Sequence, residues 1–258
     1  MKTNILEQNC VTSPAETVGQ PQSSSHELTH ILEMPRTPQE IFLEEIISNK
    51  PRNFLIIGSR EAGKTTLAIG LTKKLYQCNP TMETIVFTQK HVMKKYTNSL
   101  TNIKNEFTEF SNSSLEKIYD NQMAISKKPI IIIFDDSIYS TKFNNSKILN
   151  EVLFNGRFYN IFTIFIIQYP IGLCPELRTN FDNVFHFCAN SISNIKRAYD
   201  HYYGSCGNFS YFEKTITGLK NYWCACTSKN QKMVLYKDQD PNNFSNQILK
   251  NNPITIPK

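Results

Sequence analysis

The sequence predicts an α/β fold with a mainly parallel central sheet, helices on both faces of the sheet and a small C-terminal helix-hairpin appendage. The first indication is a series of short, almost wholly apolar segments that alternate with helical or polar stretches. Strands without polar alternation are typical of parallel sheets buried on both faces. The expected strands cover residues 53–57, 84–88, 130–134, 162–167 and 183–187.

The second indication is a change of pattern after Phe187, which predicts the appendage. Residues 191–203 and 209–219 have a helical pattern, and the segments 221–227 and 232–236 resemble a terminal hairpin. Before the first strand, apolar residues recur at helical spacing over 38–49 and predict a short helix. We expect a flexible, polar N-terminal tail over 1–33, a single domain over 34–240 and a C-terminal tail over 241–258.

The third indication is a phosphate-binding loop between the first strand and the following helical stretch. Residues 54–66 read FLIIGSREAGKTT, which contains the pattern G-x-x-x-x-G-K-[ST] in its proper strand-to-helix setting. Lys64 is expected to reach the β- and γ-phosphates, and Thr65 to ligate Mg²⁺. The residues expected to hold ATP are Gly58, Ser59, Arg60, Glu61, Ala62, Gly63, Lys64, Thr65 and Thr66.

Composition narrows the class of protein further. The 258 residues carry a net charge of +6, which is compatible with a polyanionic partner but does not require one. Seven cysteines without even spacing favour a reducing compartment over a disulfide framework. Cys224 and Cys226 fit alternate positions of an apolar strand better than a zinc site. No segment is long and apolar enough to predict a membrane span, so we expect a protein without a transmembrane segment.

Two carboxylates follow the apolar strand at 130–134. Asp135 is expected to hold Mg²⁺ through water or through Thr65. Asp136 occupies the position where many ATPases carry a Glu that polarises the attacking water. The competing interpretation is a turn in which an aspartate caps the next helix.

Gln168 follows the next strand and is expected to face the γ-phosphate. An extra strand that lies between the two nucleotide motifs and ends in a polar sensor separates RecA-like and ring-forming ATPases from GTPases and simple kinases. We therefore expect a P-loop NTPase of the RecA/ASCE type, in which the Gln168 strand lies between the strands that lead to Lys64 and Asp135. Gln168 as a simple strand-end cap is the alternative.

Arg157 and Arg178 bracket this strand in sequence. An arginine donated across a subunit interface stabilises charge on the transferred phosphoryl group. Either residue is a candidate for such a finger, although each alone is also compatible with a surface or helix-capping role.

These segments together resemble the genome-packaging ATPases of large double-stranded DNA viruses and virophages, a poxvirus-type family of FtsK/HerA-type translocases. The resemblance covers about residues 50–205 and is most specific in NGRFY at 155–159, in QYP at 168–170 and in LRTN at 177–180. It implies the nucleotide and Mg²⁺ roles given above, a γ-phosphate sensor at Gln168 and an arginine that completes a neighbour's site. Phe158 stands where the family usually carries His.

The function expected from this resemblance is ATP-driven translocation that packages double-stranded DNA. It implies a homo-oligomeric ring, phosphate contacts without sequence specificity, capsid or portal-vertex partners, and a location in the host cytoplasm or the virion. The segment 90–95 is a candidate for the DNA contact. A nucleoside or nucleotide kinase and a non-hydrolysing ATP-binding scaffold of virion assembly remain the alternatives.

Overall fold

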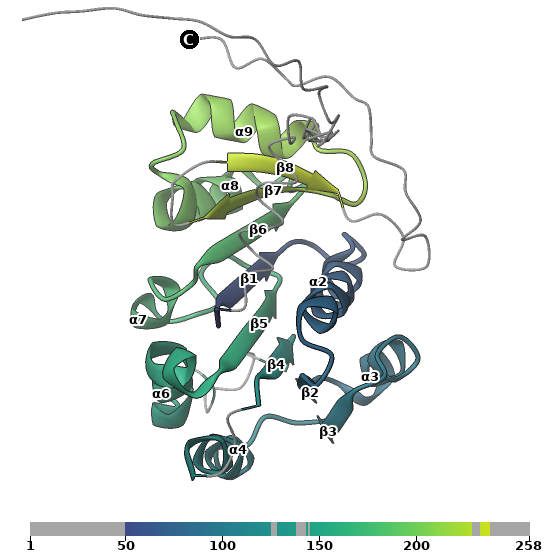
Figure 1. The fold of residues 1–258 in the computed structure, drawn as a ribbon. Helices are drawn as coiled ribbons and strands as arrows, with labels where there is room; N and C mark the ends of the chain where they lie inside the picture. The colour runs from purple at the N-terminus through teal and green to yellow at the C-terminus, as the bar shows by residue number, and fades with distance from the viewer. Residues whose placement is uncertain (1–49, 125–127, 138–142, 144, 229–232, 238–258) are drawn as a thin grey trace, which may run out of the picture. The chain divides into compact units, whose positions relative to one another are not determined.

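The computed structural model describes residues 50–124, 128–137, 143, 145–228 and 233–237. The expected tails and the helix expected at 38–49 lie outside this range. The described residues form one eight-stranded sheet in the order β3-β2-β4-β5-β1-β6-β7-β8 (Figure 1). Its strands are β1 (Asn53–Ile57), β2 (Glu83–Phe87), β3 (Ile103–Phe107), β4 (Ile130–Asp135), β5 (Ile161–Ile167), β6 (Asn183–Phe187), β7 (Trp223–Ser228) and β8 (Met233–Lys237).

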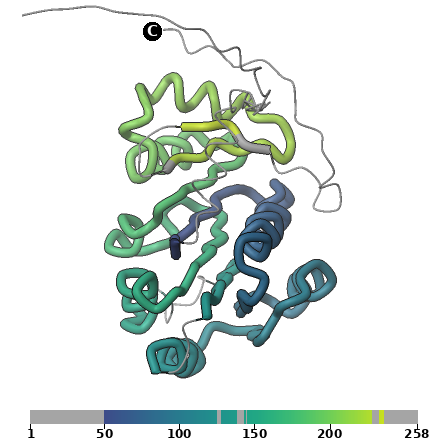
Figure 2. Tube along the Cα trace, viewed as in Figure 1, coloured from purple at the N-terminus to yellow at the C-terminus, as the bar shows by residue number. Residues whose placement is uncertain are grey.

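The first six strands are parallel, and β7 and β8 join them antiparallel to β6 and to each other. The five strands expected from the apolar segments are all present, and the α/β fold class is confirmed. The expected hairpin is also present as β7 and β8, and it extends the central sheet. The chain can be followed from the first parallel strands to this hairpin in Figure 2.

Strand β3 was not predicted from the sequence. It reads IKNEF, and its three central residues are exposed because the strand forms the free edge of the sheet. A strand with little buried surface lacks the apolar run by which the other parallel strands were found.

Helices cover both faces of the sheet (Figure 1). One face carries α2 (Lys64–Cys78) and α3 (Lys90–Thr97). The opposite face carries α4 (Asn112–Ala124), α6 (Lys147–Asn155), α7 (Pro175–Arg178), α8 (Ile192–Ala198) and α9 (Phe209–Gly218). A 3-10 turn, η2 (Gly156–Tyr159), follows α6, and a π-helical turn, η3 (Tyr199–Tyr203), follows α8.

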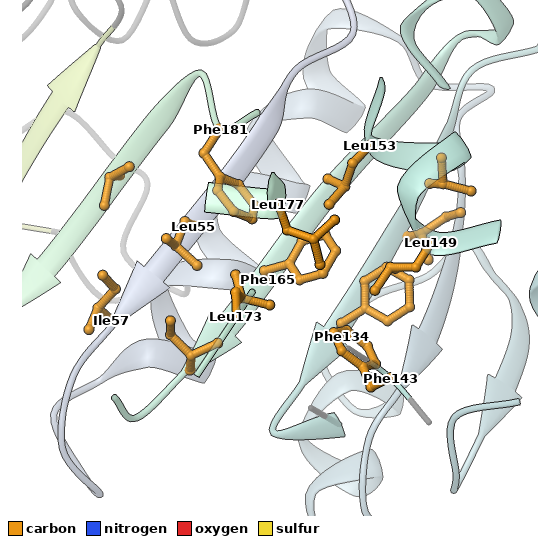
Figure 3. Close-up of a cluster of buried hydrophobic side chains, with 14 of the residues drawn as sticks. Leu55, Ile57, Phe134, Phe143, Leu149, Leu153, Phe165, Leu173, Leu177 and Phe181 are labelled. Carbon is orange, nitrogen blue, oxygen red and sulfur yellow. The ribbon is translucent and has the colours of Figure 1, made fainter. Parts of the chain in front are cut away.

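Each strand supplies both halves of the core because successive side chains point to opposite faces. In β1, Leu55 and Ile57 face the α6 and α7 side, where Figure 3 shows Leu55 near Phe165 and Leu177. Phe54 and Ile56 face α2. All five residues of β1 are buried, which is the burial expected of a central parallel strand.

A buried polar network fixes the amino-terminal edge of the sheet. The Asn53 side-chain amide donates to the carbonyls of Leu153 and Asn180, and its Oδ1 accepts from Thr163 at 2.8 Å. The Asn53 backbone N–H donates to Asp182 Oδ2 at 2.8 Å. These bonds hold β1 in register with β5 and β6, and therefore align the opposite ends of the three strands, where the phosphate-binding loop begins.

Candidate nucleotide-binding site

The candidate phosphate-binding loop connects β1 to α2, as the sequence predicted. Gly63 caps α2 with a left-handed φ of +104°, and Glu61 also has a positive φ of 62°. These turns direct the first amides of α2 toward the loop, where the helix dipole favours an anion. Thr65 and Thr66 lie in the first turn of α2 and are half-buried.

Close packing at Gly58, and the left-handed backbone at Gly63, favour glycine at two positions of the loop. A Cβ at Gly58 would lie 2.9 Å from Phe187 Cβ, and one at Gly63 would lie 2.9 Å from Tyr222 Cδ1. The aromatic residues behind the loop therefore come from β6 and from the turn before β7. Ser59, Arg60 and Glu61 at the tip are exposed, whereas Ala62 is half-buried.

Lys64 lies inside the loop. Its Nζ donates to the Ser59 carbonyl at 2.7 Å, and only 7% of the residue is exposed. Burial lowers the Lys64 pKa, while the nearby carboxylates of Asp136 and Asp135 oppose the shift. The ammonium group is thus held within the loop and close to the second motif.

Asp135 is the last residue of β4 and is 3% exposed. Its Oδ2 accepts two hydrogen bonds, one from Thr65 Oγ1 at 2.9 Å and one from Tyr96 Oη at 2.8 Å. Burial raises the pKa of the carboxyl, and the two donors oppose that shift. A direct hydrogen bond therefore joins Asp135 and Thr65, the two residues that the sequence predicts for Mg²⁺.

The donor set around Thr65 and Asp135 fits Mg²⁺. A hydroxyl and a carboxylate are hard oxygen ligands, and Mg²⁺ at nucleotide sites is commonly held by one or two carboxylates together with the phosphates. The sequence analysis missed Tyr96, a fully buried residue of α3 that contacts the same oxygen. Its apolar spacing from Met93 signals a buried position but gives no indication of a carboxylate partner.

Asp136 and Gln168 lie together. Gln168 Nε2 donates to Asp136 Oδ2 at 2.9 Å, and the Asp136 backbone N–H donates to the Ile166 carbonyl at 3.2 Å. Asp136 has a positive φ of 50°, an uncommon conformation for a residue other than glycine. Within the described part of the chain, its buried Oδ1 has no hydrogen-bond partner. One oxygen therefore faces Gln168, and the other is available as an acceptor.

The strand order produces this arrangement. β5 lies between β1 and β4, as the sequence predicted, and Ile57 is paired with Ile167 while Asp135 is paired with Ile166. The residues that follow the three strands therefore emerge side by side at the carboxyl edge of the sheet. Ligands of open α/β sheets bind at this edge.

The two arginines lie elsewhere. Arg157 belongs to η2, at the amino-terminal edge, where its guanidinium lies 4.0 Å from Asp182. Arg178 ends α7, donates from Nε to the Leu173 carbonyl at 2.8 Å, and lies 3.1 Å from His201 Nε2. Among the described residues, neither arginine forms a hydrogen bond or an ion pair with Lys64, Asp135 or Asp136.

The chain is similar to viral proteins of unassigned function. It is 36% identical over 107 residues to protein L437 of Acanthamoeba polyphaga mimivirus, covering 41% of this chain and 35% of that protein. It is 26% identical over 193 residues to protein 088R of Invertebrate iridescent virus 3, covering 69% of this chain and 73% of that protein. The match thus spans only about a third of the mimivirus protein. No protein-family model matches the chain.

Solved structures show the same fold. B204, the DNA-packaging ATPase from Sulfolobus turreted icosahedral virus, has a TM-score of 0.59 at 18% identity, covering 73% of this chain and 98% of B204. The conjugation coupling protein TcpA of pCW3, solved with ATPγS, has a TM-score of 0.53 at 11% identity, covering 73% of this chain and 60% of TcpA. The chain therefore shares its fold with a DNA-packaging ATPase and with a conjugation coupling protein. No helix in the described ranges is both long and apolar enough to cross a membrane.

Proposed function

We propose that the protein is an ATP-hydrolysing DNA translocase that packages viral double-stranded DNA into a capsid. The observation that carries the proposal is the position of β5 between β1 and β4, with Gln168 2.9 Å from Asp136 at the edge where the phosphate-binding loop begins. This arrangement gives the site a γ-phosphate sensor in contact with a candidate catalytic carboxylate. The shared fold with B204 and TcpA supports the same function.

The chemistry follows from the side chains of the site. Lys64 and the amides of the loop bind the phosphates, and Asp136 accepts a hydrogen bond from the attacking water through its unpartnered Oδ1. Thr65 and Asp135 would hold Mg²⁺, which when bound would neutralise charge on the phosphate oxygens. Gln168 exchanges its bond to Asp136 for one to the γ-phosphate, so that the presence of ATP changes the position of the β5 end.

We assign the arginine finger to Arg178, which acts on the site of a neighbouring subunit in a homo-oligomeric ring. Arg178 is held by carbonyls of the segment that follows Gln168, whereas Arg157 lies near the buried carboxylate of Asp182 and has a structural role there. Mixing Arg178→Ala with Lys64→Ala protein should restore activity that neither variant has alone. Arg157→Ala is the matched control and should not complement Lys64→Ala in this way.

The exposed face of α3 is the proposed DNA contact. Lys90, His91, Lys94 and Lys95 are exposed, and the helix contains no acidic residue. The inner face of the same helix places Tyr96 on Asp135. If α3 shifts when it binds DNA phosphates, the Tyr96 hydroxyl will move relative to the Asp135 carboxylate to which it donates. Contacts from α3 to the DNA phosphates would be independent of base sequence.

The DNA contact has a matched control. Lys94→Ala combined with Lys95→Ala removes two charges from α3, and Lys196→Ala combined with Arg197→Ala removes two from α8, on the opposite face of the sheet. Only the α3 variant should lose stimulation by DNA, and its basal ATPase rate should be retained. Equal effects of the two double variants would contradict the assignment to α3.

The primary test is the ATPase rate with and without linear duplex DNA. Wild-type protein should be stimulated by DNA, and Lys64→Ala and Asp136→Asn should abolish the activity. Transfer of phosphate to a nucleoside would instead identify a kinase. Weak hydrolysis that is indifferent to DNA, with loss of oligomers in Lys64→Ala, would identify a scaffold. Capsid or portal-vertex partners and a location at the assembly site or in the virion belong to the same proposal.

A further inference from the structure

Tyr222 is an exposed aromatic residue in contact with the phosphate-binding loop. It precedes β7, in a turn closed by a hydrogen bond from the Trp223 N–H to the Lys220 carbonyl at 3.0 Å. Its ring lies so close to Gly63 that a Cβ there would be 2.9 Å from Tyr222 Cδ1. Even so, 54% of the residue is exposed, so that part of the ring is free beside the loop.

The backbone of Tyr222 is also unusual. Its φ is +67°, in the left-handed region that bulky side chains seldom adopt. Non-glycine residues in this region are concentrated at binding and catalytic sites, where the surrounding structure holds them. A glycine would satisfy the same turn without strain, so the turn alone does not account for the aromatic side chain.

The strand order gives the direction in which a nucleotide lies on the loop. Asp135, Asp136 and Gln168 follow β4 and β5, on one side of β1, and they mark the γ-phosphate end. Tyr222 precedes β7 and lies on the other side of β1, beyond β6. A triphosphate whose γ end faces β4 and β5 therefore carries its nucleoside toward β6 and β7.

We infer that Tyr222 is the stacking platform for the purine base of the nucleotide. This inference rests on the proposed nucleotide-binding function and adds a residue that the phosphate-loop motif does not contain. The ring offers an aromatic face to a planar base, and stacking of this kind tolerates different bases because each has a π-face. Tyr222 would thus make the protein bind a nucleotide more tightly than a bare polyphosphate.

The test compares a non-hydrolysable ATP analogue with inorganic tripolyphosphate, each titrated with Mg²⁺ by calorimetry and without DNA. Tyr222→Ala should weaken binding of the analogue by about 5- to 150-fold, the range expected for loss of one base-stacking contact. Binding of tripolyphosphate should be unchanged. Tyr222→Phe keeps the ring and should bind both ligands as the wild type does.

Tyr169→Ala is the matched control. Tyr169 is 53% exposed and follows Gln168 on the γ-phosphate side, so its loss should leave the ratio of the two affinities unchanged. An unchanged ratio in Tyr222→Ala, with both ligands weakened equally or not at all, would overturn the base-stacking role and leave the proposed function intact. Wild-type protein that binds neither ligand would instead refute the nucleotide site itself, and the inference with it.

Discussion

Replacing Tyr96 by Phe removes one hydroxyl from the buried carboxylate of the second nucleotide motif and keeps the ring. Tyr96 is completely buried, and its hydroxyl lies 2.8 Å from Asp135 Oδ2. Thr65 also donates to this oxygen. Because Asp135 is only 3% exposed, we expect no bulk water to replace the missing donor.

The expected loss of stability follows from the charge of the acceptor. A hydrogen bond to a charged group contributes about 1.5–3 kcal/mol to stability, against about 1 kcal/mol for a neutral pair. Tyr96→Phe should therefore lower the free energy of unfolding by about 1.5–3 kcal/mol when Asp135 is ionised. Protonation of Asp135 makes the pair neutral and should reduce the deficit to about 1 kcal/mol.

The direction of the pH dependence follows from the Asp135 pKa. Burial raises it in the folded protein, so the folded state binds this proton more tightly than the unfolded state does. The contribution of Asp135 to stability therefore falls as the pH rises through its folded pKa. Tyr96 donation opposes the upward shift, and its removal raises the pKa further, which makes the fall with pH larger in the variant.

Urea unfolding without Mg²⁺ measures this difference at two pH values, one above and one below the folded pKa of Asp135 as located from the pH dependence of stability. Tyr76→Phe is the matched control, because Tyr76 Oη lies 2.6 Å from the neutral Thr84 Oγ1. It should cost about 0.5–1.5 kcal/mol at both pH values. A Tyr96→Phe deficit that is the same at both pH values, or no larger than that of Tyr76→Phe, would refute the charged hydrogen bond described here.

Three further predictions concern the loop and the core. Gly63→Ala places a side chain at a φ of +104° and should lower the free energy of unfolding by about 1–3 kcal/mol. It should also abolish the stabilisation by ATP that thermal unfolding measures. Gly218→Ala is the control, because a Cβ there meets nothing within 4 Å and should cost little stability. Tyr203→Phe removes a buried hydroxyl that lies 2.9 and 3.1 Å from carbonyls of β6 and β7. This change should lower the free energy of unfolding by about 1 kcal/mol and speed amide exchange in β6 and β7. An unchanged exchange rate would contradict the hydrogen bonds from Tyr203 to these strands. His186 is buried, which lowers its pKa from 6.5 to about 4, so the unfolded chain binds the proton more tightly. Stability should thus fall as the pH decreases from 6.5 to 4, by at most about 1.4 kcal/mol per unit, and His186→Gln should flatten this slope.

Much of the fold could be predicted because the central strands are buried on both faces and are therefore apolar throughout. β1 and β6 have the predicted bounds, and β2, β4 and β5 differ from prediction by a residue at one or both ends. β3 could not be found in this way, since an edge strand with exposed Lys104 and Glu106 has no apolar run. Local patterns thus identify strands in proportion to how much of each strand the sheet buries.

The sequence by itself determined the loop between β1 and α2 and the position of the two aspartates, because short-range spacing fixes a strand-loop-helix turn and the tip of a strand. Only the tertiary structure brought Gln168 to Asp136, Tyr96 to Asp135 and Tyr222 to Gly63. It also separated Arg157 from the carboxyl edge. The three contacts join residues that are 32 to 159 positions apart in the sequence. They depend on strand order and helix packing. Both arise from burial and backbone pairing along the whole sheet rather than from any local pattern.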